Sequence, residues 1–222
     1  WADRFGDMAV FIKNDLRLIK RSKRARGTVL GGAFFLLYGF IFYYQDDLWP
    51  EWMQFFGYMF VSGGFLFMFG SFVPSWDSQY YKLMMCQNIP YIDYIKSKWL
   101  LVVLVTIIST ILGCIIYSSI GLNAICAVLA GGLYNIGVNG YLTLWAGAYT
   151  KTPIDLNSSK NAFGDTKALN MKTMLISIPQ MILPLVLFGI CNNYFGWLFG
   201  CTAVAFIGIL GIFLKDVVFE LI

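Results

Sequence analysis

The sequence contains six long runs of apolar residues, each close to the length that crosses a lipid bilayer. A transmembrane helix needs about 20 consecutive apolar residues, because the hydrocarbon core is about 30 Å thick. The runs do not alternate apolar and polar residues, as the strands of a membrane β-barrel would. They occupy residues 28–44, 52–73, 99–120, 122–149, 173–191 and 194–214, and the short gaps predict tight turns near Gly121 and at Asn192 and Asn193. The sequence therefore predicts an all-α, polytopic membrane protein with six transmembrane helices.

The composition agrees with a membrane protein and limits its chemistry. Of the 222 residues, 59% are hydrophobic and 13% are charged, whereas soluble domains have about 45–50% apolar and about 25% charged residues. The chain has no histidine, which removes the commonest general base and a common zinc ligand. Its five cysteines show no paired spacing, and no glycine-rich phosphate loop is present. We therefore expect no catalytic residue, no metal and no cofactor, and we do not expect an enzyme.

The basic residues predict how the chain is oriented in the membrane. All 16 of them precede the first run, follow the sixth, or lie in the segments 74–98 and 150–172. The segment that joins the first two runs contains Asp46, Asp47 and Glu51 instead. Since Lys and Arg accumulate on the cytoplasmic side, both termini and both long segments are predicted to be cytoplasmic. The basic residues are therefore assigned to the inner face of a membrane protein and not to a nucleic-acid surface.

The interior of the predicted membrane region carries no ionisable side chain. None of the six runs contains Asp, Glu, Lys or Arg. Proton-coupled carriers, voltage sensors and intramembrane aspartyl proteases need such groups inside the membrane. If the protein moves a substrate uphill, we expect the energy to come from outside the membrane domain.

The first 27 residues form a separate region ahead of the membrane domain, which we place at 28–222. Apolar side chains recur here at helical spacing, and basic side chains occupy most of the other positions. This pattern predicts an amphipathic helix in the cytoplasmic interface. Its role is either to anchor the chain to anionic lipid or to contact a cytoplasmic partner, and both can hold. The apolar positions are Phe5, Met8, Ala9, Ile12, Leu16 and Ile19.

The segment 74–98 is too polar to cross the membrane and too patterned for a simple loop. Ser75 is a candidate N-cap and Asp77 would lie in the first turn, which predicts a short helix from about 76 to 86. Asn88 and Pro90 would end it before a second helix leads into the third run. The segment is either a connector on the membrane surface or a docking helix. The candidate partner-coupling residues are Trp76, Asp77, Tyr80, Tyr81 and Lys82.

Polar residues and prolines mark the fourth and fifth runs. Asn135 and Asn139 lie at helical spacing on a face of small residues, where packing between helices competes with a polar lining as the interpretation. In the fifth run, Pro179 and Pro184 flank Gln180. Proline removes a backbone donor, so this helix is predicted to kink or break. All five residues are candidates for a transport pathway or for helix packing.

Several strings resemble a known class of membrane protein. RLIKRSKRARG, YGFIFYY, SWDSQYYKLMM, YIKSKW and PIDLNSSKNAFG are similar to segments of an ABC-2-like permease family of Gram-negative bacteria. The overall pattern resembles the permease half of an ABC-2 type exporter. Members of that family are generally longer, and the chain begins at Trp1, so it resembles their C-terminal half and is expected to be part of a longer polypeptide. ABC-2 exporters often place short helices between the last two spans, whereas only residues 191–196 are available here.

The resemblance implies a multi-pass subunit of the bacterial inner membrane that exports a hydrophobic or amphiphilic substrate. A separate cytoplasmic ABC ATPase would hydrolyse ATP, and the permease would pair with a second half or a second copy, in contact with membrane lipids. By this likeness the segment from Trp76 to Met85 would be the coupling helix. The alternative is a membrane scaffold or assembly factor whose helices present the two cytoplasmic loops to a partner.

Overall fold

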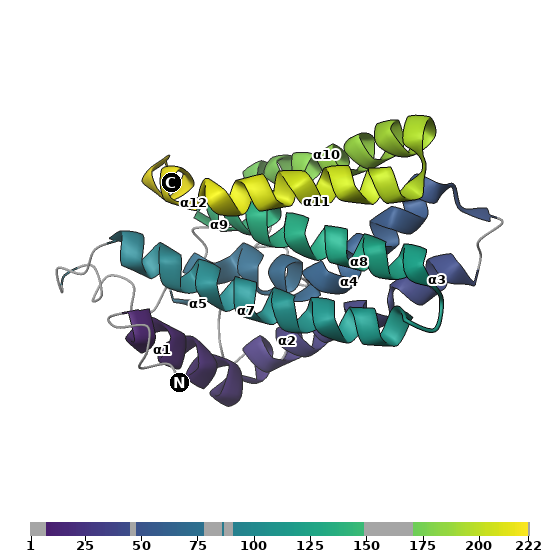
Figure 1. Ribbon diagram of the computed structural model, residues 1–222. Coiled ribbons are helices and arrows are strands. Elements are labelled where there is room, and N and C mark those ends of the chain that lie inside the picture. The colour runs from purple at the N-terminus through teal and green to yellow at the C-terminus, as the bar shows by residue number, and fades with distance from the viewer. Residues whose placement is uncertain (1–7, 45–47, 78–85, 87–90, 149–170, 222) are drawn as a thin grey trace.

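The computed structural model is helical throughout the residues that it describes. Its helices lie side by side along one axis, and both chain ends lie at the same end of the bundle (Figure 1). The described residues contain no strand, which confirms the all-α prediction. The structure describes residues 8–44, 48–77, 86, 91–148 and 171–221. The segment 149–170, and with it most of the predicted loop 150–172, lies outside this part.

The N-terminal region folds as the predicted amphipathic helix, followed by the first apolar passage. Helix α1 spans Met8–Arg21, and α2 spans Lys23–Phe34. Between them, Ser22 has an extended backbone, and its side-chain oxygen accepts a hydrogen bond from the backbone N–H of Ala25 at 3.3 Å. This N-cap separates the two helices. The passage continues through η2 (Phe35–Leu37) and α3 (Gly39–Tyr43).

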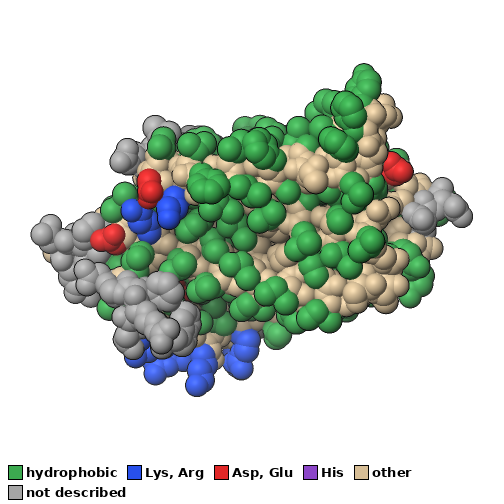
Figure 2. All heavy atoms as spheres, viewed as in Figure 1, with side chains coloured by type: hydrophobic (Ala, Val, Ile, Leu, Met, Phe, Trp, Pro, Cys, Tyr) green, Lys and Arg blue, Asp and Glu red, His purple; other side chains and the backbone are tan. Residues whose placement is uncertain are grey.

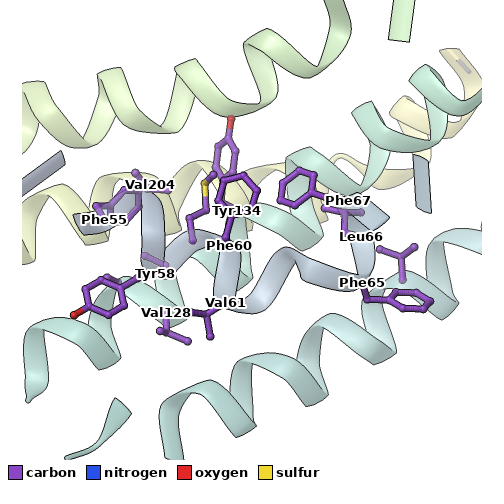
Figure 3. Close-up of a cluster of buried hydrophobic side chains, with 14 of the residues drawn as sticks. Phe55, Tyr58, Phe60, Val61, Phe65, Leu66, Phe67, Val128, Tyr134 and Val204 are labelled. Atoms are coloured by element: carbon purple, nitrogen blue, oxygen red, sulfur yellow. The ribbon is translucent and has the colours of Figure 1, made fainter. Parts of the chain in front are cut away.

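The second passage forms the centre of the bundle. Helix α4 spans Glu51–Met68 and is followed by the short helices η4 (Gly70–Phe72) and α5 (Val73–Trp76). Helix α4 contacts α2, α3 and several helices from later in the chain. Its aromatic and aliphatic side chains belong to one cluster with Val128 and Val204, which come from two later helices (Figure 3). Close packing of these side chains against the surrounding helices makes α4 the core element of the fold.

The third and fourth passages are joined by the tight turn that the sequence predicts at Gly121. Helix α7 spans Tyr91–Tyr117, and α8 spans Leu122–Tyr134. Gly121 has φ 141°, a conformation that L side chains rarely adopt. The fourth passage continues as a π-helical turn, η5 (Asn135–Asn139), and as α9 (Gly140–Ala148). Helix α7 begins before the apolar run does, so polar residues such as Lys98 lie within it.

The last passages correct two sequence predictions. Helix α10 spans Met171–Phe195 without interruption, so its two prolines do not break it. The predicted turn at Asn192 and Asn193 is wrong, since both residues lie inside α10. The chain turns at Gly196, which has φ 88° and no Cβ to oppose that backbone.

Helix α11 then spans Trp197–Phe213 and α12 spans Lys215–Leu221. Within the described residues, five stretches are long and apolar enough to cross a membrane, and α11 is an apolar helix of 17 residues. They match the six apolar runs of the sequence in order. The five long stretches are Lys23–Tyr43, Glu51–Phe72, Tyr91–Tyr117, Leu122–Gly147 and Ser177–Phe195. The chain therefore has the helices of a multi-pass membrane protein.

Glycine permits a very close approach between η5 and α11. A Cβ added to Gly208 would lie 2.5 Å from the carbonyl carbon of Leu133, and one added to Gly137 would collide with the carbonyl of Gly208. A Cβ on Gly211 would collide with the carbonyl of Gly137. In each case the obstacle is backbone, which cannot rotate away. The two helices are therefore in contact through their main chains, as small residues allow in membrane bundles.

This contact predicts that Gly208→Ala destabilises the bundle. The added methyl group forces two backbones apart, and overpacking of this kind costs about 1–3 kcal/mol. The matched control is Gly189→Ala in α10, where a Cβ would meet no atom within 4 Å and helix propensity favours alanine. Thermal unfolding in detergent should show a lower Tm for the first variant only. Equal Tm values for the two variants would contradict the close contact.

Candidate functional site

A buried cluster of charged residues lies at the end of the bundle where the chain begins and ends. Lys98 of α7 forms ion pairs with Asp15 of α1 and with Asp77, which follows α5, the second at 2.6 Å between Nζ and Oδ2. The side chains of Lys98 and both aspartates are at most 3% exposed. Tyr94 donates a hydrogen bond from its hydroxyl to Oδ2 of Asp77 at 2.8 Å. We call these four residues the ionic cluster.

Local structure brings each member of the ionic cluster into place. Tyr94 and Lys98 are four residues apart on α7 and therefore share a face. Asp15 lies on the buried face of α1 together with Phe11 and Ile12, and the Phe11 ring meets Tyr94 edge-on at 5.7 Å. Asp77 is carried inward because it is the C-cap of α5. The cluster therefore links α1 to α7 and to the end of the second passage.

Burial raises the pKa of Asp15 despite the neighbouring ammonium group of Lys98. Two carboxylates share one ammonium group in a buried place, so one negative charge is not compensated within the cluster. Burial raises the pKa of Asp15 to about 6, with Asp77 adding to the effect and Lys98 opposing it. Among the described residues, Oδ2 of Asp15 accepts no hydrogen bond. Asp15 therefore exchanges its proton much nearer to neutral pH than an ordinary aspartate does.

An apolar cluster surrounds these charges and joins five helices. The ring of Trp99 stacks on Tyr141 at 5.6 Å, and Phe219 of α12 lies edge-on to both rings. Lys96 lies over the ring of Phe219, at 5.8 Å from its centroid. The buried members are Phe11, Val73, Tyr94, Ile95, Tyr141, Leu144 and Phe219. With the ionic cluster they form one packed unit, here called the basic-end junction.

Two of the predicted partner-coupling residues belong to this interior. Trp76 is 1% exposed; its ring stacks on Phe69 at 5.3 Å, and its Nε1 donates to the Phe69 carbonyl at 3.2 Å. Asp77 is fully buried. Both side chains thus pack within this chain and form no outer surface. The expectation that they face a partner differs from the structure, because stacking on Phe69 turns Trp76 inward and the ion pair with Lys98 turns Asp77 inward.

The predicted short helix after Ser75 differs from the structure at its start. Helix α5 begins at Val73 with proline in its first turn, so Ser75 lies inside it and is not the N-cap. Three further candidates of this segment, Tyr80, Tyr81 and Lys82, lie outside the described residues.

A second polar group lies inside the bundle, between α4, the fourth passage and α10. Asn135 donates from Nδ2 to the Met59 carbonyl at 3.0 Å and to Ser62 Oγ at 2.9 Å. Asn139 donates to Oδ1 of Asn135 at 2.8 Å. Gln180 donates to Thr143 Oγ1 at 2.8 Å and to the Asn139 carbonyl at 3.4 Å. The side chains of Ser62, Asn135, Asn139, Thr143 and Gln180 are all buried and form the interior polar network.

The hydrogen bonds of Asn135 agree with the helix-packing interpretation, because they connect η5 to α4, as Asn side chains do between membrane helices. The side chain of Asn139 bonds within η5, to Asn135. Both residues lie in η5, and π-helical turns occur often at functional sites. Oδ1 of Asn139 has no partner among the described residues. Whether these residues also line a transport pathway stays a prediction.

The two prolines of α10 occupy different environments. Pro184 is buried on the same face as Gln180, four residues away. Pro179 instead lines an open apolar groove of about 560 Å³ on the outer side of α10, together with Ile182 and Val186. Of the three candidate residues on α10, Gln180 and Pro184 therefore face the bundle interior, and Pro179 faces outward.

The apolar runs alone do not predict the ionic cluster, because Lys98 precedes the third run by one residue and so falls in a predicted loop. The available signal is the position of Asp15. It is the only acidic residue of α1, and it lies three and four residues after Ile12 and Phe11 on one helical face. Leu16, predicted on that face, is 40% exposed. The buried face is thus rotated from the one that the apolar spacing indicates.

We predict that Lys98→Met strongly destabilises the protein at neutral pH. It leaves two buried carboxylates without their cation, and breaking a buried pair costs about 3–5 kcal/mol. The control is Lys96→Met on the same helix, which removes only a partly exposed cation above a ring, worth about 1 kcal/mol or less. Denaturant unfolding measures both variants. Similar free energies of unfolding for the two would refute the structural role of the cluster.

The raised pKa of Asp15 predicts a pH-dependent stability. Between its ordinary value of 3.8 and about 6, the folded protein holds more protons at this residue than the unfolded chain does. The contribution of this proton to the free energy of unfolding is therefore complete below the ordinary pKa. It is lost as the pH rises through about 6. Wild type should lose stability relative to Asp15→Asn as the pH rises from about 4 to about 6, and the difference should stay constant above that range. Parallel stability curves for the two proteins would exclude this titration.

Comparison with known proteins identifies a family but no characterised relative. No curated protein and no solved structure matches the chain significantly. The model of a family of unknown function, DUF5687, matches residues 1–222. Since the match covers the whole sequence, the chain belongs to the DUF5687 family.

Proposed function

We propose that the protein is the membrane-embedded permease subunit of an ATP-driven, ABC-2-like exporter. It moves a hydrophobic or amphiphilic substrate outward across the bacterial inner membrane, and a separate cytoplasmic ABC ATPase hydrolyses ATP. The observation that carries the proposal is the ionic cluster. It connects α1, a surface helix with a basic exposed face, directly to α7 and to the end of the second passage.

This connection suits the transmission of force from a cytoplasmic partner. The exposed face of α1 carries Arg17, Lys20 and Arg21, while its buried face is held by Asp15 and Phe11. A partner that displaces α1 must also displace Lys98 and Asp77, because separating them leaves a buried charge unpaired. Two passages would therefore move with one surface helix. A discrete shift of packed helices is a common form of conformational switching.

The interior polar network suits the proposed substrate class. Its side chains are neutral, so it offers hydrogen bonds without a charge that would hold an amphiphile tightly. It also lies between three passages whose relative movement would open or close a path. The absence of an ionisable side chain among its five members supports an energy source outside the membrane.

The distribution of charge supports the proposed orientation. In the view of Figure 2, lysine and arginine side chains gather at the end where the termini lie, and hydrophobic side chains cover the middle of the face. Glu51 lies at the opposite end of the bundle, at the start of α4. By the positive-inside rule, the basic end with both termini is cytoplasmic and six passages cross the membrane. The apolar outer faces of α10 and α11 would contact lipid or a second permease half, contributed by another chain or by a homodimer.

The test is co-purification with the ABC ATPase subunit encoded nearest to the gene of this protein. The double variant Arg17→Glu with Arg21→Glu should reduce the recovered ATPase about tenfold or more, because opposed charges become like charges. The control is Lys215→Glu, an exposed charge reversal at the same end but on α12. It should leave the recovered amount unchanged.

ATP-dependent uptake of a fluorescent amphiphile into inside-out vesicles completes this test. Sidedness is checked in a background without the native cysteines. Asn193→Cys should react with an impermeant reagent from outside, and Lys20→Cys only after permeabilisation. Bound ATPase without ATP-dependent uptake would reject the permease and favour the scaffold. Labelling of Lys20→Cys from outside would reject the orientation.

A further inference from the structure

An open pocket of about 500 Å³ lies at the end of the bundle opposite the basic-end junction. It is formed where α3, the start of α4, the turn at Gly121 and the start of α11 meet. Its lining includes Tyr43, Glu51, Gln54, Tyr58, Asn123 and Trp197. The volume falls within the usual range for small-molecule sites, about 300–1,000 Å³. We call it the acidic-end pocket.

The charge of this pocket favours a cation. Glu51 lies in the first turn of α4, and one of its carboxylate oxygens accepts a hydrogen bond from Asn192. No lysine or arginine occurs in the three segments that join passages at this end, residues 45–51, 118–123 and 192–196. A bound cation would therefore have no competing basic side chain in the chain segments around it. An anion would meet a carboxylate with no compensating positive charge.

The aromatic walls add a second feature that recognises cations. Trp197 donates from Nε1 to the Asn123 carbonyl at 2.9 Å, and its ring is edge-on to Phe188 at 5.0 Å. Tyr58 is 4% exposed and lies edge-on to Tyr117 at 5.5 Å. These contacts hold the lining rings in place before any ligand arrives. The faces of such rings attract ammonium groups, most strongly when the cation is desolvated.

We propose that the acidic-end pocket binds the organic ammonium head of a cationic amphiphile. Glu51 supplies the counter-charge, and the rings of Tyr43, Tyr58 and Trp197 supply the apolar and cation–π surface. The pocket opens at the surface beside exposed apolar residues, including Leu122 at 76% exposure, where an alkyl tail can leave it. The assignment deepens the proposed function by naming a substrate class, and it rests on that function only for the step from binding to export.

Binding can be measured without any partner, on the protein purified in lipid nanodiscs. The probe is hexyltrimethylammonium, compared with the neutral hexyl glucoside by isothermal titration calorimetry, with empty nanodiscs as the baseline. Glu51→Gln keeps an acceptor for Asn192 but removes the charge, and it should raise the Kd for the ammonium about tenfold or more. Tyr43→Leu, at a partly exposed ring, should raise it about threefold.

The matched control is Asp93→Asn, which removes the same charge from the first turn of α7 at the other end of the bundle. The Kd of this variant for the ammonium should stay within about twofold of the wild-type value, because solvent and salt screen a charge at the distant end of the bundle. Equal binding of the ammonium by wild type and Glu51→Gln overturns the proposal, as does equal binding of the two probes by wild type. So does a signal no larger than that of the empty nanodiscs.

The binding result and the transport result can fail separately. ATP-driven export of a neutral amphiphile, with no ammonium binding, would overturn the substrate class and leave the proposed function in place. Ammonium binding at Glu51 without any ATP-driven export would support the pocket and remove the permease function.

Discussion

The ammonium group of Lys98 must be neutralised inside the protein, and this need organises one end of the bundle. A buried charge costs several kcal/mol unless opposite charges and hydrogen bonds surround it. Its two partners come from α1 and from the end of α5, which are 83 and 21 residues away in the sequence. Correct pairing therefore requires the surface helix, the second passage and the third passage to dock together. The aromatic rings around the cluster exclude water and make that requirement stricter.

A different principle holds the membrane-spanning part together. Lipid tails are as apolar as the side chains, so burial of apolar surface from lipid supplies little driving force there. Close contact between helices supplies the driving force instead. Gly208 lies against the backbone of Leu133, and Gly32 lies against the backbone of Gly64. The interior polar network adds directional bonds, since Asn135 reaches α4 and Gln180 reaches α9. Packing and neutral hydrogen bonds thus replace the charges used at the basic end.

This difference explains which features were predictable. Apolar runs and the turn at Gly121 follow from local composition, and the structure confirms them. The pairing of Asp15 with Lys98 depends on how α1 rotates against α7, which the spacing of apolar residues in α1 alone does not determine. The turn at Gly196 was missed because asparagine and glycine are both turn formers, and only the positive φ distinguishes them. The sequence alone favours Trp76 as a surface anchor, because its stacking partner, Phe69, lies seven residues earlier in the turn between α4 and η4.

The two ends of the bundle are built for different tasks. At the basic end, charges are buried and paired, so any movement of α1 is transferred to the passages that hold its partners. At the acidic end, Glu51 is exposed at a pocket, and a neutral amide, that of Asn192, donates a hydrogen bond to its carboxylate. A paired charge resists exchange, whereas a carboxylate beside open space can accept a cation with little rearrangement. If α7 and α4 tilt when α1 moves, the pocket changes shape, because α4 and the turn after α7 form its wall. Such a tilt would couple the two ends without any charge crossing the membrane interior.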